Sequence, residues 1–167
     1  EWQAFEKEIG NPHPYTLLDR EEIKTYVNSD RYLGGLHNTA NGHLHPLNLC
    51  IGEAEALSGL GGAIYEQSRV MAIEPGALPV VRTEAGSITA KTIVLAGNAY
   101  MGGLVPKLSK RVLPSASSVI ATAPLTPELA QRILPGDVAV CDPRTALDYF
   151  RLSADQRLLF GGLSNYT

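Results

Sequence analysis

Residues 92–96 are the feature that most constrains the fold. The run Thr-Ile-Val-Leu-Ala is mostly apolar and β-branched, and it ends at Gly97. Strands buried on both faces of a parallel sheet have this unbroken pattern, so the sequence predicts a core strand here. In such sheets, ligands bind beyond the carboxyl ends of the strands, which makes Ala96, Gly97 and Asn98 candidate ligand contacts. The alternative is that these residues form an ordinary strand-to-helix turn without a ligand.

Helical and antiparallel patterns flank this run. Apolar residues recur at helical spacing over 47–57, behind Pro46 at a first helical position. A short helix is expected after Asp19, with Glu22 completing a capping-box-like pair. Further strands are predicted over 63–67, 80–83, 88–91, 118–123, 138–141 and on both sides of a turn at 153–156, with a helix over 126–132. The fold class is therefore mixed α/β, or α+β.

The composition argues against several classes of function. The 167 residues carry 14 Lys and Arg against 17 Asp and Glu, a net charge of −3. Nucleic-acid-binding domains are basic, so no nucleic-acid partner is expected. No apolar run approaches the roughly 18 residues that a membrane span requires. Cys50 and Cys141 form no CxxC pair, which predicts two buried, reduced thiols in a cytoplasmic protein.

Three histidines form a first candidate cluster. His43 and His45 would share one face of a strand, and with His37 they could bind a metal ion. No carboxylate lies between them, and a usable site needs three ligands and supporting contacts. The favoured interpretation is no metal, with His45 as the N-cap before Pro46 and His43 at a surface.

A second candidate cluster lies near the C-terminus. Tyr149 and Arg151 share one face of a predicted strand, and Phe150 and Leu152 share the other. We expect Phe150 and Leu152 to face the core. Tyr149 and Arg151 then either line a cavity that orients a polar substrate or form a solvated face, and the pattern leaves both open.

The order of these segments resembles a known family. Residues 34–46, the helix that follows them, and residues 63–70 and 92–100 are similar to the middle of FAD-dependent amine and amino-acid oxidoreductases. This is the superfamily of D-amino-acid oxidase, sarcosine oxidase and glycine oxidase, and the likeness is greatest to its bacterial gamma-glutamylputrescine oxidoreductase branch. Residues 111–125 and 148–162 resemble the sheet of its substrate domain.

The resemblance implies three segments. Residues 1–45 form a helical connector and a first substrate-domain segment, residues 46–107 a partial Rossmann-like FAD-binding domain, and residues 108–167 an antiparallel-rich substrate-domain sheet. It also implies that Tyr149 and Arg151 face the substrate, and that the FAD contacts are Val70, Ala96, Gly97, Asn98 and Tyr100. The family's GxGxxG strand and its C-terminal closing segment do not occur in the sequence. We therefore expect an internal fragment that alone is inactive, lacks FAD and self-associates through its uncovered side.

The full-length parent is accordingly expected to be a cytoplasmic flavoprotein of putrescine catabolism. It would oxidise the C–N bond of a small-molecule amine or amino acid by hydride transfer to the flavin, and water would hydrolyse the imine. No residue stands out as an obligatory acid or base. Two alternatives stay open: a metal-dependent enzyme that uses His37, His43 and His45, and a non-catalytic small-molecule-binding or assembly module.

Overall fold

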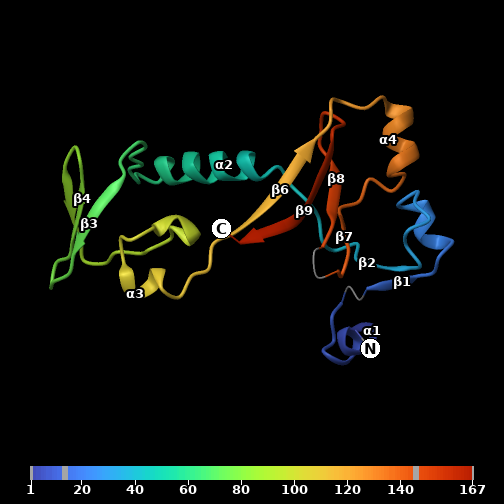
Figure 1. Cartoon of the computed structure of the whole chain (residues 1–167), viewed down its shortest axis with the longest axis horizontal. Coiled ribbons are helices and arrows are strands. Elements are labelled where there is room, and N and C mark those ends of the chain that lie inside the picture. Colours follow the sequence, from blue (N-terminus) through green and yellow to red (C-terminus); the bar gives the residue numbers. More distant parts are fainter. Residues whose placement is uncertain (1, 13–14, 145–146, 167) are drawn as a thin grey trace. The chain divides into compact units, whose positions relative to one another are not determined.

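The computed structural model describes residues 2–12, 15–144 and 147–166, and these divide into two compact units (Figure 1). Unit 1 comprises residues 2–46 and 117–165, and unit 2 comprises residues 47–116 with Tyr166. Unit 2 is therefore inserted in sequence between the two halves of unit 1.

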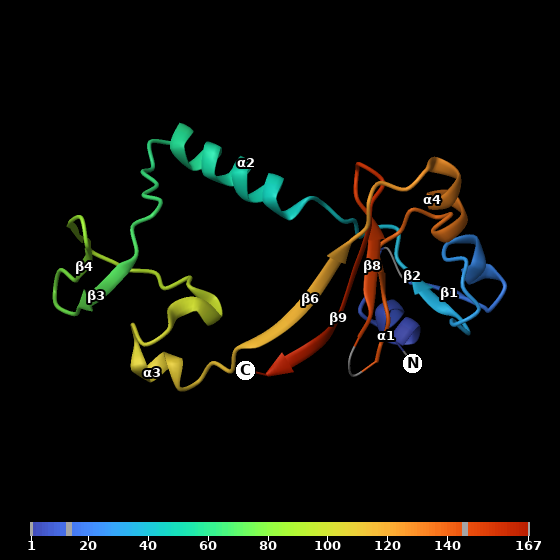
Figure 2. The same ribbon diagram turned by 45° about the horizontal axis from the view of Figure 1, so that its top comes forward.

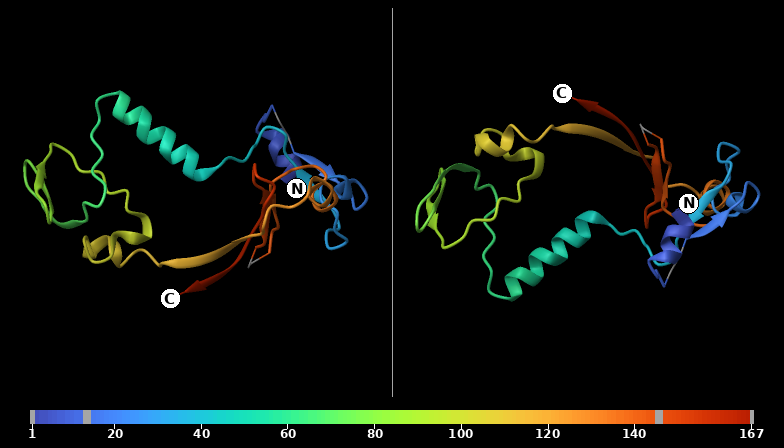
Figure 3. Two further views of the ribbon diagram at one scale, coloured as in Figure 1. Left: turned by 90° about the horizontal axis from the view of Figure 1, so that it is seen from above. Right: turned by 90° about the horizontal axis from the view of Figure 1, so that it is seen from below.

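Unit 1 combines two sheets with short helices. Its elements are α1 (Trp2–Glu8), β1 (Thr16–Leu18), the 3₁₀-helix η1 (Glu22–Thr25), β2 (Gly35–His37), most of β6 (Ser115–Ala121), α4 (Pro127–Ile133), β7 (Val140–Cys141), β8 (Tyr149–Leu152) and β9 (Leu158–Tyr166). β1 and β2 pair antiparallel. The larger sheet has the order β6-β9-β8-β7, and β6 and β9 run side by side in Figures 2 and 3.

The core of unit 1 lies where α4 packs against β8. Val27, Ala130, Leu134 and Leu152 form one buried cluster, in which Leu134 is 1% exposed. Phe150 packs against this cluster, which confirms the expected core face of β8. Burial of these side chains supplies the main stabilisation of the unit, because apolar area removed from water contributes about 25 cal/mol per Å².

Local capping signals fix the helices of unit 1 as predicted. Thr126 caps α4, and its Oγ1 accepts a hydrogen bond from the backbone N–H of Leu129 at 3.3 Å. Around η1, the N–H of Glu22 donates to Asp19 Oδ1 at 2.8 Å, and the N–H of Asp19 donates to Glu22 Oε2 at 2.9 Å. This is the reciprocal pairing of a capping box.

Unit 2 contains one long helix and a small sheet. Its elements are α2 (Pro46–Gly59), β3 (Val70–Glu74), β4 (Val80–Thr83), β5 (Ser87–Thr89), the 3₁₀-helix η2 (Asn98–Met101) and α3 (Pro106–Ser109). The predicted helix and hairpin are confirmed, since α2 begins at Pro46 and β4 pairs antiparallel with β5. No described residue between 47 and 116 is buried.

Two predicted strands of unit 2 are not formed. Residues 63–67 are irregular, and Gln67 has a φ of 51°, a left-handed conformation that a strand does not accommodate. Residues 92–96 are also not a strand, and Val94 is 82% exposed. The run has the composition of a buried strand, but no described strand pairs with it, because the sheet ends at β5.

The expected burial of the cysteines is also wrong. Both are exposed free thiols. Cys50 lies on α2, which has no buried residue, and Cys141 lies on β7 at the edge of its sheet. None of the helices in the described part of the chain has the length and apolarity that crossing a membrane demands.

Candidate functional site

Tyr149 lies on the face of β8 opposite the core. It pairs with Gly161 across the sheet, and its ring covers that glycine so closely that a Cβ there would collide with the ring. The Tyr149 hydroxyl lies 3.3 Å from Ser117 Oγ on β6. Gly161 therefore leaves the space that the Tyr149 ring occupies, because a side chain there would displace the ring.

Arg151 lies on the same face, and its guanidinium donates hydrogen bonds to backbone carbonyls of the same chain. Nη1 donates to the carbonyl of Leu152 at 3.1 Å, and Nη2 donates to the carbonyl of Leu44 at 3.1 Å. Nη1 also lies 3.5 Å from Nδ1 of His43. Arg151 thus ties β8 to the segment that precedes α2.

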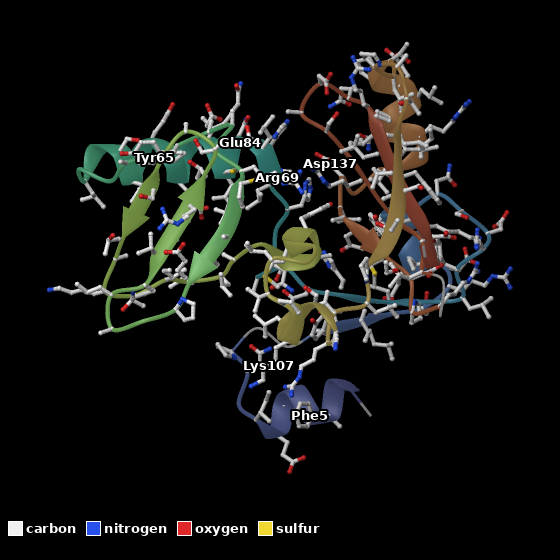
Figure 4. The ribbon with its side chains drawn as sticks, turned by 60° about the vertical axis from the view of Figure 1, so that its left-hand side comes forward. Phe5, Tyr65, Arg69, Glu84, Lys107 and Asp137 are labelled. Atoms are coloured by element: carbon white, nitrogen blue, oxygen red, sulfur yellow. The ribbon has the colours of Figure 1, made fainter. Side chains whose placement is uncertain are left out.

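Unit 1 also contains an open cavity of about 1360 Å³. It lies beside β1, β2 and β7, with an apolar floor that includes Ile23, Val27 and Val138. Among the described residues that line it, the Asp, Glu, Lys and Arg positions are all carboxylates, without a Lys or Arg. They are Asp19, Glu22, Asp137 (labelled in Figure 4) and Asp142. Three tyrosines and two histidines add polar groups, namely Tyr15, Tyr26, Tyr32, His37 and His43. This lining favours a cation over an anion.

Asp142 is the buried carboxylate of this cavity, at 5% exposure. Its Oδ1 accepts hydrogen bonds from the backbone N–H groups of Asp148 at 3.0 Å and Arg144 at 3.3 Å. Nε of Arg144 lies 3.4 Å from its Oδ2. Burial, and next the negative charge of Asp142, raise the pKa of the Tyr32 hydroxyl above its ordinary value. Tyr32 therefore stays a neutral hydrogen-bond donor and acceptor.

Sequence reasoning did not identify Asp142 or Tyr32. The available signal was an aspartate followed by Pro143 directly after a predicted strand, a pattern typical of turns in which the carboxylate binds nearby backbone N–H groups. Tyr32 carries no comparable signal, because Asp142 and Asp148, whose charges act on its hydroxyl, are more than 100 positions away.

A three-histidine metal site is not formed. No group of three or more His, Cys, Asp or Glu among the described residues could hold a metal ion. The ring of His37 lies against the ring of Tyr26, with centroids 4.4 Å apart. A guanidinium stands beside Nδ1 of His43, where it disfavours a second cation.

The residues assigned to the cofactor lie in unit 2. Gly97 precedes η2, Asn98 has a φ of 47°, and the Tyr100 side chain is 94% exposed. Ala96, Gly97 and Asn98 are exposed and small or compact, so a planar ligand can reach their backbone, and in that respect they fit a cofactor contact. Val70 stands apart from them in sequence, at the start of β3.

Comparison with known proteins identifies the class. The model of the DAO family, FAD dependent oxidoreductase, matches residues 1–166, and the chain therefore belongs to this family. Glycine oxidase from Geobacillus kaustophilus has a TM-score of 0.74 at 19% identity, over 98% of this chain and 43% of its own. L-proline dehydrogenase from P.horikoshii has a TM-score of 0.73 at 17% identity, over 94% and 42%. Both confirm the fold class.

Two curated relatives are more similar in sequence. Gamma-glutamylputrescine oxidoreductase of Escherichia coli (strain K12) is 48% identical over 147 residues, which are 87% of this chain and 34% of that protein. A probable oxidoreductase, OrdL, of Haemophilus influenzae is 41% identical over 155 residues, 89% of this chain and 36% of its own length. The chain thus spans about a third of these relatives.

Proposed function

We propose that the full-length protein is a cytoplasmic oxidoreductase that oxidises the C–N bond of a small amine or amino acid, of the gamma-glutamylputrescine type. The observation that carries the proposal is the 48% identity with a gamma-glutamylputrescine oxidoreductase over 87% of this chain. When bound, FAD supplies the hydride acceptor, and the protein supplies binding and orientation.

In this proposal two parts of the chain have separate roles, with bounds close to those of the two units. Residues 46–107 form part of the FAD-binding domain, with Ala96, Gly97, Asn98 and Tyr100 at the cofactor and Val70 near its adenine. Residues 1–45 and 108–167 form the substrate domain. Its sheet presents the face with Tyr149 and Arg151 to the substrate. These two residues are not among those that line the unit 1 cavity, whose acidic lining is a separate feature that supports a cationic amine.

The substrate class is tested on the full-length enzyme. An absorbance spectrum of the purified protein reports flavin, and turnover is compared for gamma-glutamylputrescine, putrescine, glycine and proline. We expect a flavin spectrum and the highest kcat/KM for gamma-glutamylputrescine. Preference for glycine or proline would contradict the substrate class, and a protein without flavin would contradict the proposal as a whole.

The cofactor placement is tested at Gly97. A Cβ there would lie 2.6 Å from Cγ of Met101, so Gly97→Val also creates an internal collision. Comparing Gly97→Val with Gly97→Val/Met101→Ala separates this collision from the cofactor, because the double variant removes only the collision. We expect both to lose flavin, while Gly103→Val retains it, since nothing lies near Gly103. Full flavin occupancy in the double variant would contradict the placement.

We further propose that the 167-residue chain alone is inactive, binds no FAD and self-associates. The support is unit 2, which has no buried residue in its described part and exposes an unpaired apolar segment at 92–96. Calorimetric titration with FAD and light scattering test both parts. Micromolar FAD binding by a strict monomer would contradict them together.

A further inference from the structure

The Arg151 side chain contacts two groups of the segment before α2, the carbonyl of Leu44 and the ring of His43. The guanidinium donates to the carbonyl of Leu44 at 3.1 Å and lies 3.5 Å from Nδ1 of His43. Its third partner is the carbonyl of Leu152, the next residue along β8, also at 3.1 Å. The planar guanidinium has five N–H donors in a fixed fork, so one side chain can make all three contacts.

This contact fixes the tautomer of His43. An arginine side chain can only donate hydrogen bonds, so the ring nitrogen that faces it must be an acceptor. A neutral imidazole with an acceptor at Nδ1 carries its proton on Nε2, whereas a doubly protonated ring would set one N–H group against another. Arg151 therefore leaves His43 with a single N–H, at Nε2.

The chemistry of the cavity restricts what that N–H can bind. His43 lines the unit 1 cavity, whose Asp, Glu, Lys and Arg lining residues are all acidic. A neutral carbonyl oxygen can accept a hydrogen bond from the Nε2–H without repulsion from the acidic lining, while the Arg151 guanidinium lies 3.5 Å from the other ring nitrogen. The lining also attracts a cation, so the matching ligand carries both an amide oxygen and an ammonium group.

We infer that Arg151 is a positioning residue for His43, and that the Nε2–H of His43 binds the amide oxygen of a cationic amine substrate. Arg151 then acts on the substrate through His43. The substrate class in this inference rests on the proposed function, but the tautomer and its dependence on Arg151 do not.

The tautomer is tested by ¹⁵N NMR on the 167-residue chain labelled at histidine. The chain has 4 histidines, which His→Gln variants assign. We expect an Nε2–H ring for His43 and a shift toward a mixture of tautomers in Arg151→Ala, with Arg151→Lys in between. Arg157→Ala is the matched control, because Arg157 donates to the carbonyl of Thr122 at 3.0 Å and not to the His43 segment.

An Nδ1–H ring in the unaltered chain would overturn the inference without any variant, which keeps the test decisive if Arg151→Ala does not fold. Identical His43 spectra in the unaltered chain and a folded Arg151→Ala variant would overturn the positioning role.

The ligand is tested with N-acetylputrescine, which combines a neutral amide with an ammonium group. We expect it to shift the His43 Nε2 resonance, and we expect His43→Ala and Arg151→Ala to weaken its binding about fivefold, as the loss of one hydrogen bond does. Putrescine, which has no amide, should bind His43→Ala and the unaltered chain equally. An unmoved His43 resonance, or an equal response to glutarate, would overturn the ligand assignment. Loss of flavin from the full-length enzyme would instead contradict only the proposed function.

Discussion

Unit 1 and unit 2 differ in where their apolar residues lie. In unit 1 the apolar residues of α4 and β8 meet in one buried cluster. In unit 2 the large apolar residues of α2 are about half exposed, namely Leu47, Leu49, Ile51 and Leu57. An apolar face on a helix is typical of a surface that packs against a neighbouring element. Unit 1 therefore has a core of its own, whereas we expect unit 2 to depend on a surface that covers it.

The largest expected effect separates the two units by a matched pair of leucines. Leu134→Ala, at the C-cap of α4, should lower the free energy of unfolding by about 2–5 kcal/mol, because it leaves a cavity in a closed core. Leu57→Ala in α2 should change it by less than about 0.5 kcal/mol in the 167-residue chain. Chemical denaturation followed by circular dichroism measures both. Equal losses would show that α2 is already covered.

A smaller effect is expected at Gly161, within unit 1. Gly161→Ala should destabilise the chain by about 1–3 kcal/mol, because the new Cβ displaces the Tyr149 ring. Gly42→Ala is the control, since nothing lies within 4 Å of that position. Loss of the Tyr149 Oη contact to Ser117 can be followed by NMR. An undisturbed Tyr149 resonance in Gly161→Ala would contradict this arrangement.

Gly52 tests the exposure of α2 with a change of opposite sign. It lies inside the helix, and a Cβ added there would meet nothing within 4 Å, so Gly52→Ala should stabilise α2 by about 0.5–1 kcal/mol. Helix content by circular dichroism should rise in the 167-residue chain. If a covering surface packs on this face in the full-length protein, the same substitution should instead lower its melting temperature. A neutral result in both would contradict the dependence of unit 2 on cover.

The smallest effects are those of pH. They fall in the alkaline range for unit 1 and in the acidic range for unit 2. In unit 1, burial and Asp142 raise the pKa of Tyr32 above 10.0, so its contribution is complete below that pH and is lost as pH rises through the raised pKa. In unit 2, the hydrogen bond from Arg82 lowers the pKa of Glu74 below 4.5, so its contribution is lost as pH falls through the lowered pKa. Tyr32→Phe should reduce the loss of stability at alkaline pH, and Glu74→Gln should reduce the loss of stability at acid pH. The melting temperature, measured as a function of pH, tests both.

The elements that could be predicted from the sequence are those with local causes. The cap at Thr126, the first-position Pro46 of α2 and the alternation along β8 depend on neighbours in sequence, and all three are confirmed. Residues 92–96 have the composition of a core strand, but a strand also needs a partner, and pairing is not a local property. The pairing of Tyr32 with Asp142 and that of Arg151 with His43 likewise join residues about 110 positions apart in sequence. A periodic pattern of residues cannot predict such contacts.

The insertion of unit 2 between the halves of unit 1 has a consequence for the order of events during synthesis. α4 and β8 leave the ribosome only after residues 47–116, so Val27 has no core to join until then. Closing the intervening loop of about 70 residues costs on the order of 4 kcal/mol in chain entropy, beyond a constant, before any contact forms. Apolar α2 is meanwhile exposed during translation, and this nascent stage is where a chaperone would engage the chain.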